Sequence, residues 1–174
     1  ESEFQTIKTH AKHSYEITKS LRAVSFKASE GILYHHERLD GSGYPFNARG
    51  SEIPLYGRIL AVADVFDAIL SDRIYSSKVT PYKAIEILKD ESFGKLDPKV
   101  VNVLVKNIAD FYVGNVVKLN TGEVGEVILL NKSNLTRPLI KVNEERYIDL
   151  STNYQVEILE VVSGFQSAET VVMI

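Results

Sequence analysis

Hydrophobic residues recur at helical spacing through the first part of the chain. Residues three or four positions apart lie on one face of a helix, and apolar residues follow this spacing within 4–17 and again within 24–32. The second of these segments ends near a pair of histidines. Residues 58–70 (RILAVADVFDAIL) are almost continuously apolar, which is typical of a buried central helix. The pattern therefore predicts three helices.

Turn-forming and capping residues mark where helices stop and start. Residues 39–55 hold three glycines and two prolines, a composition that breaks helices and forms turns. Thr80-Pro81 and Asp97-Pro98 each place a capping side chain before a proline at the first helical position. We expect two further helices to begin at these prolines.

The pattern changes from helical to β-like near residues 110–114. Asn120-Thr121-Gly122 is typical of a tight turn between two strands. Five short β-rich runs in about 50 residues suggest a small barrel or curled sheet, and they lie at Val116–Leu119, Val124–Leu130, Leu139–Val142, Tyr147–Leu150 and Val156–Val162. We predict a mostly helical domain at 1–110, followed by a small all-β, barrel-like module at 111–174.

Composition restricts the class of protein. The 174 residues are 44% hydrophobic and 25% charged, as in soluble globular domains. No cysteine is present, so disulfides and thiolate metal ligands are excluded. No apolar run reaches the roughly 20 residues of a membrane-spanning helix and no signal-peptide pattern occurs, so we expect a cytoplasmic protein. The only methionine is Met173, and we expect the natural N-terminus to lie upstream of Glu1.

Charge is distributed unevenly along the chain. Residues 1–110 carry fifteen basic and fifteen acidic side chains, whereas residues 111–174 carry five basic and eight acidic ones. Binding of nucleic acid by bulk electrostatics needs a basic face. Because neither part has a basic excess, we expect no nucleic-acid polymer as a partner.

The histidine pair His35-His36 is the main candidate for metal chemistry. Adjacent residues on a helix point about 100° apart, so the two rings should serve one metal position poorly and suit a multinuclear site. The alternative is that one ring packs at a helix end while the other is solvated. His10 lies in a polar run with His13, and on its own it is more typical of a surface histidine.

Asp64 lies inside the most apolar of the predicted helices. An isolated buried carboxylate is costly, and we expect it to be neutralised, paired or bound to a cation. Asp67 follows three residues later and shares a helix face with it. Pairing with Arg58 or Arg73 is the alternative to a metal.

The string HHERLDGSGYP, with IPLYGRILAVADVFDAILSDRIY after it, resembles the signature half of the HD-GYP family, a branch of the HD metal-phosphohydrolase superfamily. The resemblance covers residues 1–110 and includes IKTHAKHSYEI at residues 7–17. It implies a helical domain that holds two or three divalent metal ions, usually iron or manganese. The metal-ligand positions that it implies are His10, His35, His36 and Asp64.

The same resemblance assigns a loop and a substrate pocket. The GYP loop that names the family falls on Gly41, Gly43, Tyr44 and Pro45. The positions that line the substrate pocket are Asp67 and Arg73, and Lys78 lies near the position of a second basic phosphate contact. The resemblance assigns no further catalytic residue within this chain.

Parts of the family pattern are missing. The family's His-Asp doublet, whose aspartate bridges two metals, and a lysine shortly after it precede the segment matched here, and no His-Asp dipeptide occurs in the chain. Ser14 stands where glycine is usual, and Ser76 stands where many members carry a basic residue. We therefore expect the chain alone to have little or no activity, and its parent protein to be the enzyme.

The resemblance implies a bacterial signalling enzyme that hydrolyses cyclic di-GMP to pGpG and GMP. Two alternatives stay open: a degenerate HD-GYP module that binds a nucleotide or a partner without hydrolysis, and an HD-type phosphohydrolase of another nucleotide. The cyclic dinucleotide is the expected substrate, and a protein bound through the GYP loop and a second copy in a homodimer are the other expected partners. The tail from Val113 resembles a β extension of some HD-GYP proteins and suggests packing or partner contact rather than catalysis.

Overall fold

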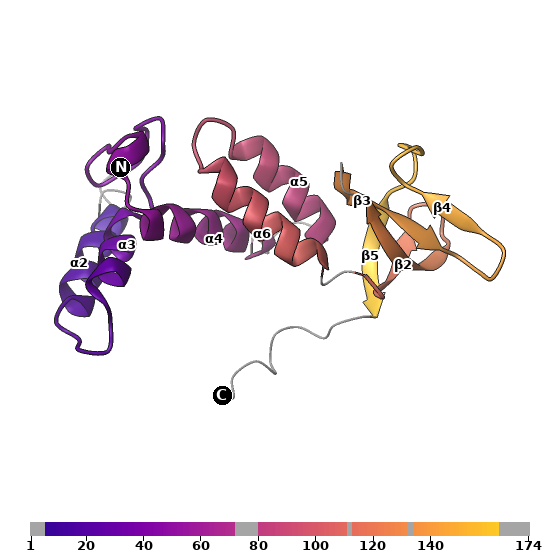
Figure 1. Ribbon diagram of the computed structural model, residues 1–174, viewed down its shortest axis with the longest axis horizontal. Coiled ribbons are helices and arrows are strands. Elements are labelled where there is room, and N and C mark those ends of the chain that lie inside the picture. The colour runs from indigo at the N-terminus through magenta and orange to yellow at the C-terminus, as the bar shows by residue number, and fades with distance from the viewer. Residues whose placement is uncertain (1–5, 72–79, 111–112, 132–133, 164–174) are drawn as a thin grey trace. The chain divides into compact units, whose positions relative to one another are not determined.

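The structure is a computed structural model, and it describes residues 6–71, 80–110, 113–131 and 134–163. Helices form the first part of the chain and strands the last part (Figure 1). The chain divides into two compact units, one made of residues 1–74 and 87–102 and the other of residues 75–86 and 103–174. The predicted fold class, a helical domain followed by a small sheet module, is confirmed.

The helices follow the predicted order. α2 packs on α3, and α3 packs on α4. Within the described ranges, no helix combines the length and the apolar character needed to cross a bilayer. The helical elements are α2 (His10–Thr18), α3 (Phe26–Tyr34), the short 3₁₀ helix η1 (Gly50–Glu52), α4 (Leu55–Ser71), α5 (Pro81–Glu91) and α6 (Pro98–Asp110).

Two glycines allow α3 and α4 to approach closely. A Cβ atom on Gly31 of α3 would lie 2.7 Å from the Cβ of Tyr56, and one on Gly57 of α4 would lie 2.8 Å from the Cβ of Tyr34. Carbon atoms pack at about 3.5–4.0 Å, so any side chain at either position would push the helices apart. The close approach sets the end of α3 against α4.

α4 is a helix, as its apolar sequence predicted, but it is only partly buried, whereas the sequence predicted a buried central helix. The buried face consists of small residues, at Gly57, Ala61 and Val62. Four larger apolar side chains on the helix are between 36% and 57% exposed; these are Leu55, Tyr56, Ile59 and Leu60. Because nearly every position of α4 is apolar, the sequence pattern could not indicate which face is covered.

Both predicted helix starts are confirmed. The hydroxyl of Thr80 accepts a hydrogen bond from the amide of Lys83 at 3.3 Å, and Oδ1 of Asp97 accepts one from the amide of Lys99 at 2.9 Å. Nη1 of Arg58 on α4 donates to Oδ2 of Asp97 at 3.2 Å. Asp97 therefore caps α6 and also ties its first turn to α4.

Five strands form one antiparallel sheet in the order β4-β3-β2-β1-β5. Among the described residues no ladder joins β4 to β5, so the sheet is open and is not closed into a barrel. The strands lie close to the predicted runs, at β1 (Val116–Leu119), β2 (Val124–Asn131), β3 (Asn134–Lys141), β4 (Tyr147–Asp149) and β5 (Ile158–Ser163).

β3 begins at Asn134, well before the predicted start at Leu139. Pro138 lies inside this strand, and a proline usually argues against a strand interior because it lacks the N–H that a ladder needs. The pairing of β3 with β2 is irregular along this stretch. The carbonyl of Pro138 still accepts a hydrogen bond from the amide of Leu150 at 3.1 Å, so the strand continues through the proline.

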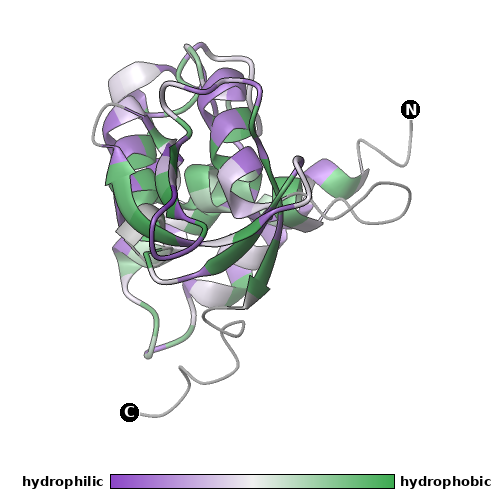
Figure 2. Cartoon of the chain, turned by 90° about the vertical axis from the view of Figure 1, so that its right-hand side faces the viewer, coloured by the Kyte–Doolittle hydropathy of each residue, from purple (hydrophilic) through white to green (hydrophobic). Residues whose placement is uncertain are grey.

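The core of the sheet unit includes one residue from a helix. Tyr82 of α5 is 4% exposed and packs in a cluster with buried side chains of the sheet. Hydrophobic residues, green in Figure 2, run along the strands. The other members of the cluster are Val117, Leu119, Val127, Ile140, Ile148, Leu150 and Val156. The domain boundary at 110/111 stays a prediction, and the packing of Tyr82 provides a way to test it.

We predict that Tyr82→Ala destabilises the sheet unit by roughly 3 kcal/mol, because it removes a large buried side chain and leaves a cavity. Tyr147→Ala is the matched control, since Tyr147 is 51% exposed on β4 and should change stability by less than about 0.5 kcal/mol. Chemical denaturation of the whole chain, followed by circular dichroism, measures both. Equal stability of the two variants would contradict the role of Tyr82 and favour a boundary at 110/111.

A second prediction concerns Asp97. Burial raises the pKa of this carboxyl, but hydrogen bonds from the Lys99 amide and from Arg58 outweigh it, so the pKa lies below its ordinary value. The charged carboxylate therefore stabilises the fold at neutral pH, and this contribution is lost as the pH falls through the lowered pKa.

Asp97→Asn should thus reduce the free energy of unfolding at pH 7, and the difference from wild type should shrink as the pH falls through the lowered pKa of Asp97. Denaturation at several pH values measures this difference, and Asp90→Asn, at an exposed position on α5, is the control. A difference that stays constant as the pH falls would contradict the prediction.

Candidate metal centre

Three imidazole rings from two separate segments meet at one point. His10 lies on α2, and His35 and His36 follow the end of α3. Nε2 of His10 lies 3.2 Å from Nε2 of His35 and 3.1 Å from Nε2 of His36. One ligand nitrogen of each ring lies within 4.8 Å of the other two, and all three residues are half-buried. Three of the four predicted ligand residues are therefore brought together.

Main-chain carbonyls orient two of these rings. Nδ1 of His10 lies 2.6 Å from the carbonyl oxygen of Ile7, and Nδ1 of His35 lies 2.6 Å from that of Ile32. Because a carbonyl oxygen can only accept, each Nδ1 carries the proton, and each neutral ring presents a lone pair at Nε2. Metal-binding histidines are commonly oriented in this way.

His35 and His36 converge because α3 ends between them. His35 is the C-cap residue of α3, and His36 lies beyond the helix. The prediction that their rings diverge by about 100° assumed a regular helix through both residues, and it is wrong. The ring centroids are 3.9 Å apart with an angle of 39° between the planes, so both rings can serve a single point beside His10.

Asp64 of α4 lies at the edge of this group. Its Oδ2 is 3.4 Å from Nδ1 of His36. Its side chain is 43% exposed, so Asp64 is not the buried carboxylate that the apolar sequence around it predicted. Arg58, the alternative partner, pairs with Asp97 instead. In the structure Asp64 contacts a ring of the group, and its role as a direct metal ligand stays a prediction.

The charge state of His36 suits binding of a cation. Burial lowers the pKa of His36 to about 4, helped by His35 and opposed by the carboxylate of Asp64. His36 is therefore neutral at pH 7, with a lone pair available. Burial and the carboxylate of Asp64 also raise the pKa of the neighbouring Tyr44, so its phenol keeps its proton.

The geometry and chemistry of these donors fit a divalent metal ion. Imidazole nitrogens bind such ions at about 2.0–2.1 Å, so two of them at right angles lie roughly 3.0 Å apart. The Nε2 separations of 3.1 and 3.2 Å around His10 are close to this value. Imidazole and carboxylate donors without thiolate suit metals such as iron, manganese and zinc. The residues present therefore fit a metal bound at their meeting point.

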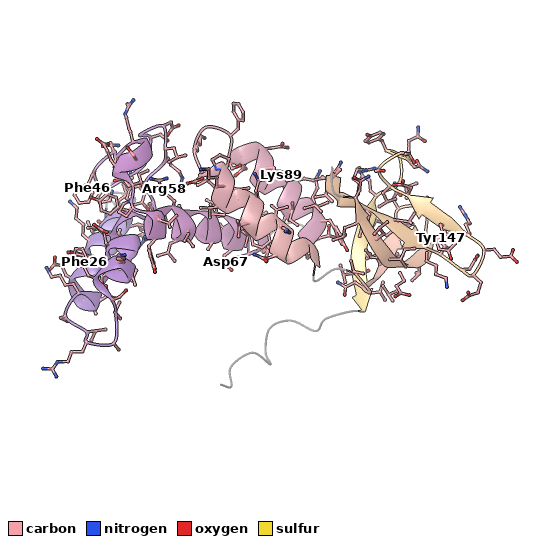
Figure 3. All side chains as sticks on the ribbon, in the orientation of Figure 1. Phe26, Phe46, Arg58, Asp67, Lys89 and Tyr147 are labelled. Carbon is pink, nitrogen blue, oxygen red and sulfur yellow. The ribbon has the colours of Figure 1, made fainter. Side chains whose placement is uncertain are left out.

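The other predicted pocket residues are placed only in part. Asp67 projects from α4, as labelled in Figure 3, and is exposed. Its Oδ2 accepts a hydrogen bond from the hydroxyl of Ser71 at 3.5 Å. Arg73 and Lys78 lie outside the described residues.

The predicted GYP loop folds back onto the histidine pair. Gly41 has a φ of +78°, and the peptide bond between Tyr44 and Pro45 is cis. The amide of Tyr44 donates to the carbonyl of His36 at 3.2 Å, and the two rings lie 4.6 Å apart with 32° between their planes. The loop thus belongs to the surroundings of the candidate centre.

Two lysines that the sequence reasoning missed also contact this loop. Nζ of Lys8 lies 5.4 Å from the ring centroid of Tyr44, and Nζ of Lys12 lies 5.6 Å from that of Phe46. Residues four apart share a helix face, so the spacing of the two lysines around His10 was the available signal. They add positive charge beside the histidine group.

The family model that describes the HD domain matches residues 1–100 of the chain. The chain belongs to the HD domain family. Members of this family are metal-dependent, in agreement with the histidine group of this HD-domain chain.

Relatives of this HD-domain chain carry related names. It is 36% identical over 140 residues to the cyclic di-GMP phosphodiesterase PA4108 of Pseudomonas aeruginosa, covering 80% of this chain and 34% of that protein. It is 40% identical over 110 residues to the cyclic di-GMP phosphodiesterase response regulator RpfG of Xanthomonas campestris, covering 63% and 29%. It is 38% identical over 113 residues to the 3'3'-cGAMP-specific phosphodiesterase 1 of Vibrio cholerae, covering 64% and 26%. These names support the resemblance to the HD-GYP branch.

The chain spans about a third or less of the length of these relatives. The 140 residues aligned with PA4108 exceed the 110 residues of the predicted helical domain. The alignment therefore extends beyond residue 110 into the part of the chain that forms the sheet.

We predict that this HD-domain chain binds Mn²⁺ through the three converging nitrogens. His35→Ala should weaken binding by more than the roughly 10–100-fold that loss of an outer contact costs, because it removes a ligand atom. Isothermal titration of the chelator-treated chain measures the affinity.

His13→Ala is the matched control, since His13 is exposed on the same helix as His10. Equal affinities of the His35→Ala and His13→Ala variants would contradict the prediction. Asp64→Asn in the same titration tests whether Asp64 is a direct metal ligand or only contacts His36. Only loss of a direct ligand should lower the Mn²⁺ affinity as much as His35→Ala does.

Proposed function

We propose that the chain is part of a metal-dependent phosphodiesterase that hydrolyses cyclic di-GMP. The observation that carries this proposal is the meeting of three imidazole rings, with Nε2 of His10 lying 3.2 Å from Nε2 of His35 and 3.1 Å from Nε2 of His36, in a member of the HD domain family. The names of PA4108 and RpfG, both cyclic di-GMP phosphodiesterases, support the choice of substrate.

The proposed metal is iron or manganese, with two or three ions in the complete domain. Its ligands in this chain are His10, His35, His36 and Asp64. A bound ion supplies a water of lowered pKa and neutralises charge on the phosphate. The chain itself keeps the rings in the correct tautomer, since the carbonyl groups behind His10 and His35 hold the proton on Nδ1 and leave Nε2 free.

The proposed reaction opens one phosphodiester bond of the ring. The oxygen of water bonds to phosphorus, and the 3′-oxygen leaves and takes a proton, which gives linear pGpG. A second hydrolysis of the same kind gives two GMP molecules. Asp67, Arg73 and Lys78 are the proposed substrate contacts, and the planar, permanently charged fork of an arginine suits phosphate oxygens.

A second candidate substrate is 3'3'-cGAMP. Two relatives from Vibrio cholerae, 38% and 36% identical to this chain, are named 3'3'-cGAMP-specific phosphodiesterases. The two cyclic dinucleotides share the same phosphodiester bonds and differ in one base. A metal centre acts on the shared phosphate, so contacts to the bases must decide between the two substrates.

The remaining partners are also proposals. We propose a protein partner at the GYP loop, where Phe46 is 50% exposed, and a homodimer of the whole protein. A basic face for nucleic-acid polymers is not expected from a net charge of −3. A parent protein that binds cyclic dinucleotides without hydrolysing them would instead be a degenerate member of the family.

The chain alone should turn over substrate poorly. Its 174 residues contain no His-Asp dipeptide, and we propose that the parent protein carries this doublet upstream of Glu1. The aspartate of the doublet would bridge two metals, and removing one member of a group that acts as a unit usually costs nearly the whole effect.

We predict that the parent protein converts cyclic di-GMP to pGpG and that its His35→Ala variant is slower by at least about 100-fold, as when a unit of catalytic groups loses a member. The parent with His13→Ala is the control and should keep its rate. Product analysis with Mn²⁺ or Fe²⁺, on a panel that includes 3'3'-cGAMP, measures turnover for the parent and for residues 1–174.

Three outcomes would change the proposal. Comparable rates per molecule for the parent and for residues 1–174 would show that the doublet is dispensable. Binding without turnover would indicate a degenerate module. Turnover of a different nucleotide alone would indicate another HD-type phosphohydrolase.

A further inference from the structure

Glu37 is a buried carboxylate with an unusual set of partners. It directly follows His36 and is 1% exposed. Its Oε1 accepts a hydrogen bond from the amide of Phe46 at 2.6 Å, and its Oε2 accepts one from the amide of Ala48 at 3.0 Å. Within the described part of the chain, no ion pair to this carboxylate is found. A buried charge is costly unless hydrogen bonds compensate it, so these two amides are what allow Glu37 to be there.

The two amides belong to the end of the GYP loop. They lie nine and eleven residues along the chain from Glu37, so the bonds close the loop onto the segment that carries the histidine pair. Gly43, inside the loop, lies so close to this segment that a Cβ would be 2.4 Å from the Cα of Glu37. Nδ2 of Asn47 donates to the carbonyl of Gly43 at 2.6 Å and tightens the loop further.

The closed loop presents Tyr44 to the histidine group. The ring of Tyr44 lies 4.6 Å from that of His36 and 6.5 Å from that of His10. Phe46 packs on Tyr34, the last residue of α3, with ring centroids 5.3 Å apart. The aromatic residues of the loop therefore pack against Tyr34 at the end of α3 and against His36, which follows the helix.

We propose that Glu37 is a positioning residue of the metal centre: its carboxylate holds the amides of Phe46 and Ala48, so that Tyr44 packs against His36 and fixes the orientation of that ring. His36 needs this support more than the other two rings do. His10 and His35 are each anchored by a main-chain carbonyl at 2.6 Å, whereas the Nδ1 of His36 has the longer contact of 3.4 Å with Asp64. The inference rests on the proposed metal centre and adds a residue outside its ligand set.

The test uses Glu37→Gln in the whole chain. Glutamine keeps the shape of the side chain, but it offers one acceptor oxygen and turns an NH₂ group toward the other amide. Glu52→Gln is the matched control, because Oε2 of Glu52 also accepts a main-chain amide, that of Arg49 at 2.7 Å, but Glu52 is exposed.

Two readouts are expected to move together. Hydrogen exchange at the amides of Phe46 and Ala48, followed by NMR without metal, should become faster by about tenfold or more as the charged acceptor is lost. Titration with Mn²⁺ should show an affinity lower by about 10–100-fold, the usual cost of removing a residue that orients a ligand. The Glu52→Gln variant should match wild type in both.

A second variant tests whether Glu37 acts on His36 through the ring of Tyr44. Tyr44→Ala should also weaken Mn²⁺ binding, and adding Glu37→Gln to it should cost little more, because coupled residues are not additive. This comparison remains decisive if Glu37→Gln alone does not fold, since a Tyr44→Ala variant with wild-type affinity would overturn the proposal.

The outcomes separate the two proposals. If Glu37→Gln speeds hydrogen exchange but leaves the Mn²⁺ affinity unchanged, Glu37 only holds the loop and its positioning role is overturned. Unchanged hydrogen exchange in this variant would also overturn that role. A wild-type chain that binds no Mn²⁺ would refute the metal centre instead. In that case the exchange rates at Phe46 and Ala48 still decide whether Glu37 holds the loop.

Discussion

The Nε2 atom of His10, which lies 3.2 Å from that of His35 and 3.1 Å from that of His36, imposes the main constraint on this molecule. Lone pairs repel at such a distance unless a proton or a metal ion lies between them. Each ring must therefore be held from behind. The carbonyl of Ile7, which precedes α2, does so for His10, and that of Ile32 on α3 does so for His35, while Asp64 and Tyr44 contact His36. A cation bound between the rings would remove this repulsion.

The positions of these rings depend on the close approach of the helices that carry them. Gly31 and Gly57 bring α3 against α4, which sets the end of α3 beside the carboxylate of Asp64. The ion pair between Arg58 and Asp97 holds the start of α6 on the same helix. Among the residues that the structure describes, the sheet unit contributes none to the histidine group. It has its own core, in which Tyr82 of α5 takes part.

Features encoded by neighbouring residues could be predicted from the sequence. The capping pairs at Thr80 and Asp97 and the turn at Gly122 act within a few residues, and the structure has them where expected. The burial of α4 could not be predicted, because almost every position on it is apolar. The partners of Asp97 and of Glu37 lie 39 and 9–11 residues away along the chain. Such contacts exist only once the fold has formed, so a motif can identify His35 and His36 without revealing why an acidic residue follows them.

The closed loop also gives a physical meaning to the spacing within HHERLDGSGYP. The segment begins with the histidine pair, and just beyond its other end the amides of Phe46 and Ala48 bond to the carboxylate of Glu37. A chain fixed at both ends cannot gain or lose a residue without moving Tyr44 away from His36. The number of residues between the histidines and the tyrosine is therefore fixed by the path of the chain around one turn. Insertions and deletions, which are common in surface loops elsewhere, would break the contact between Tyr44 and His36 here.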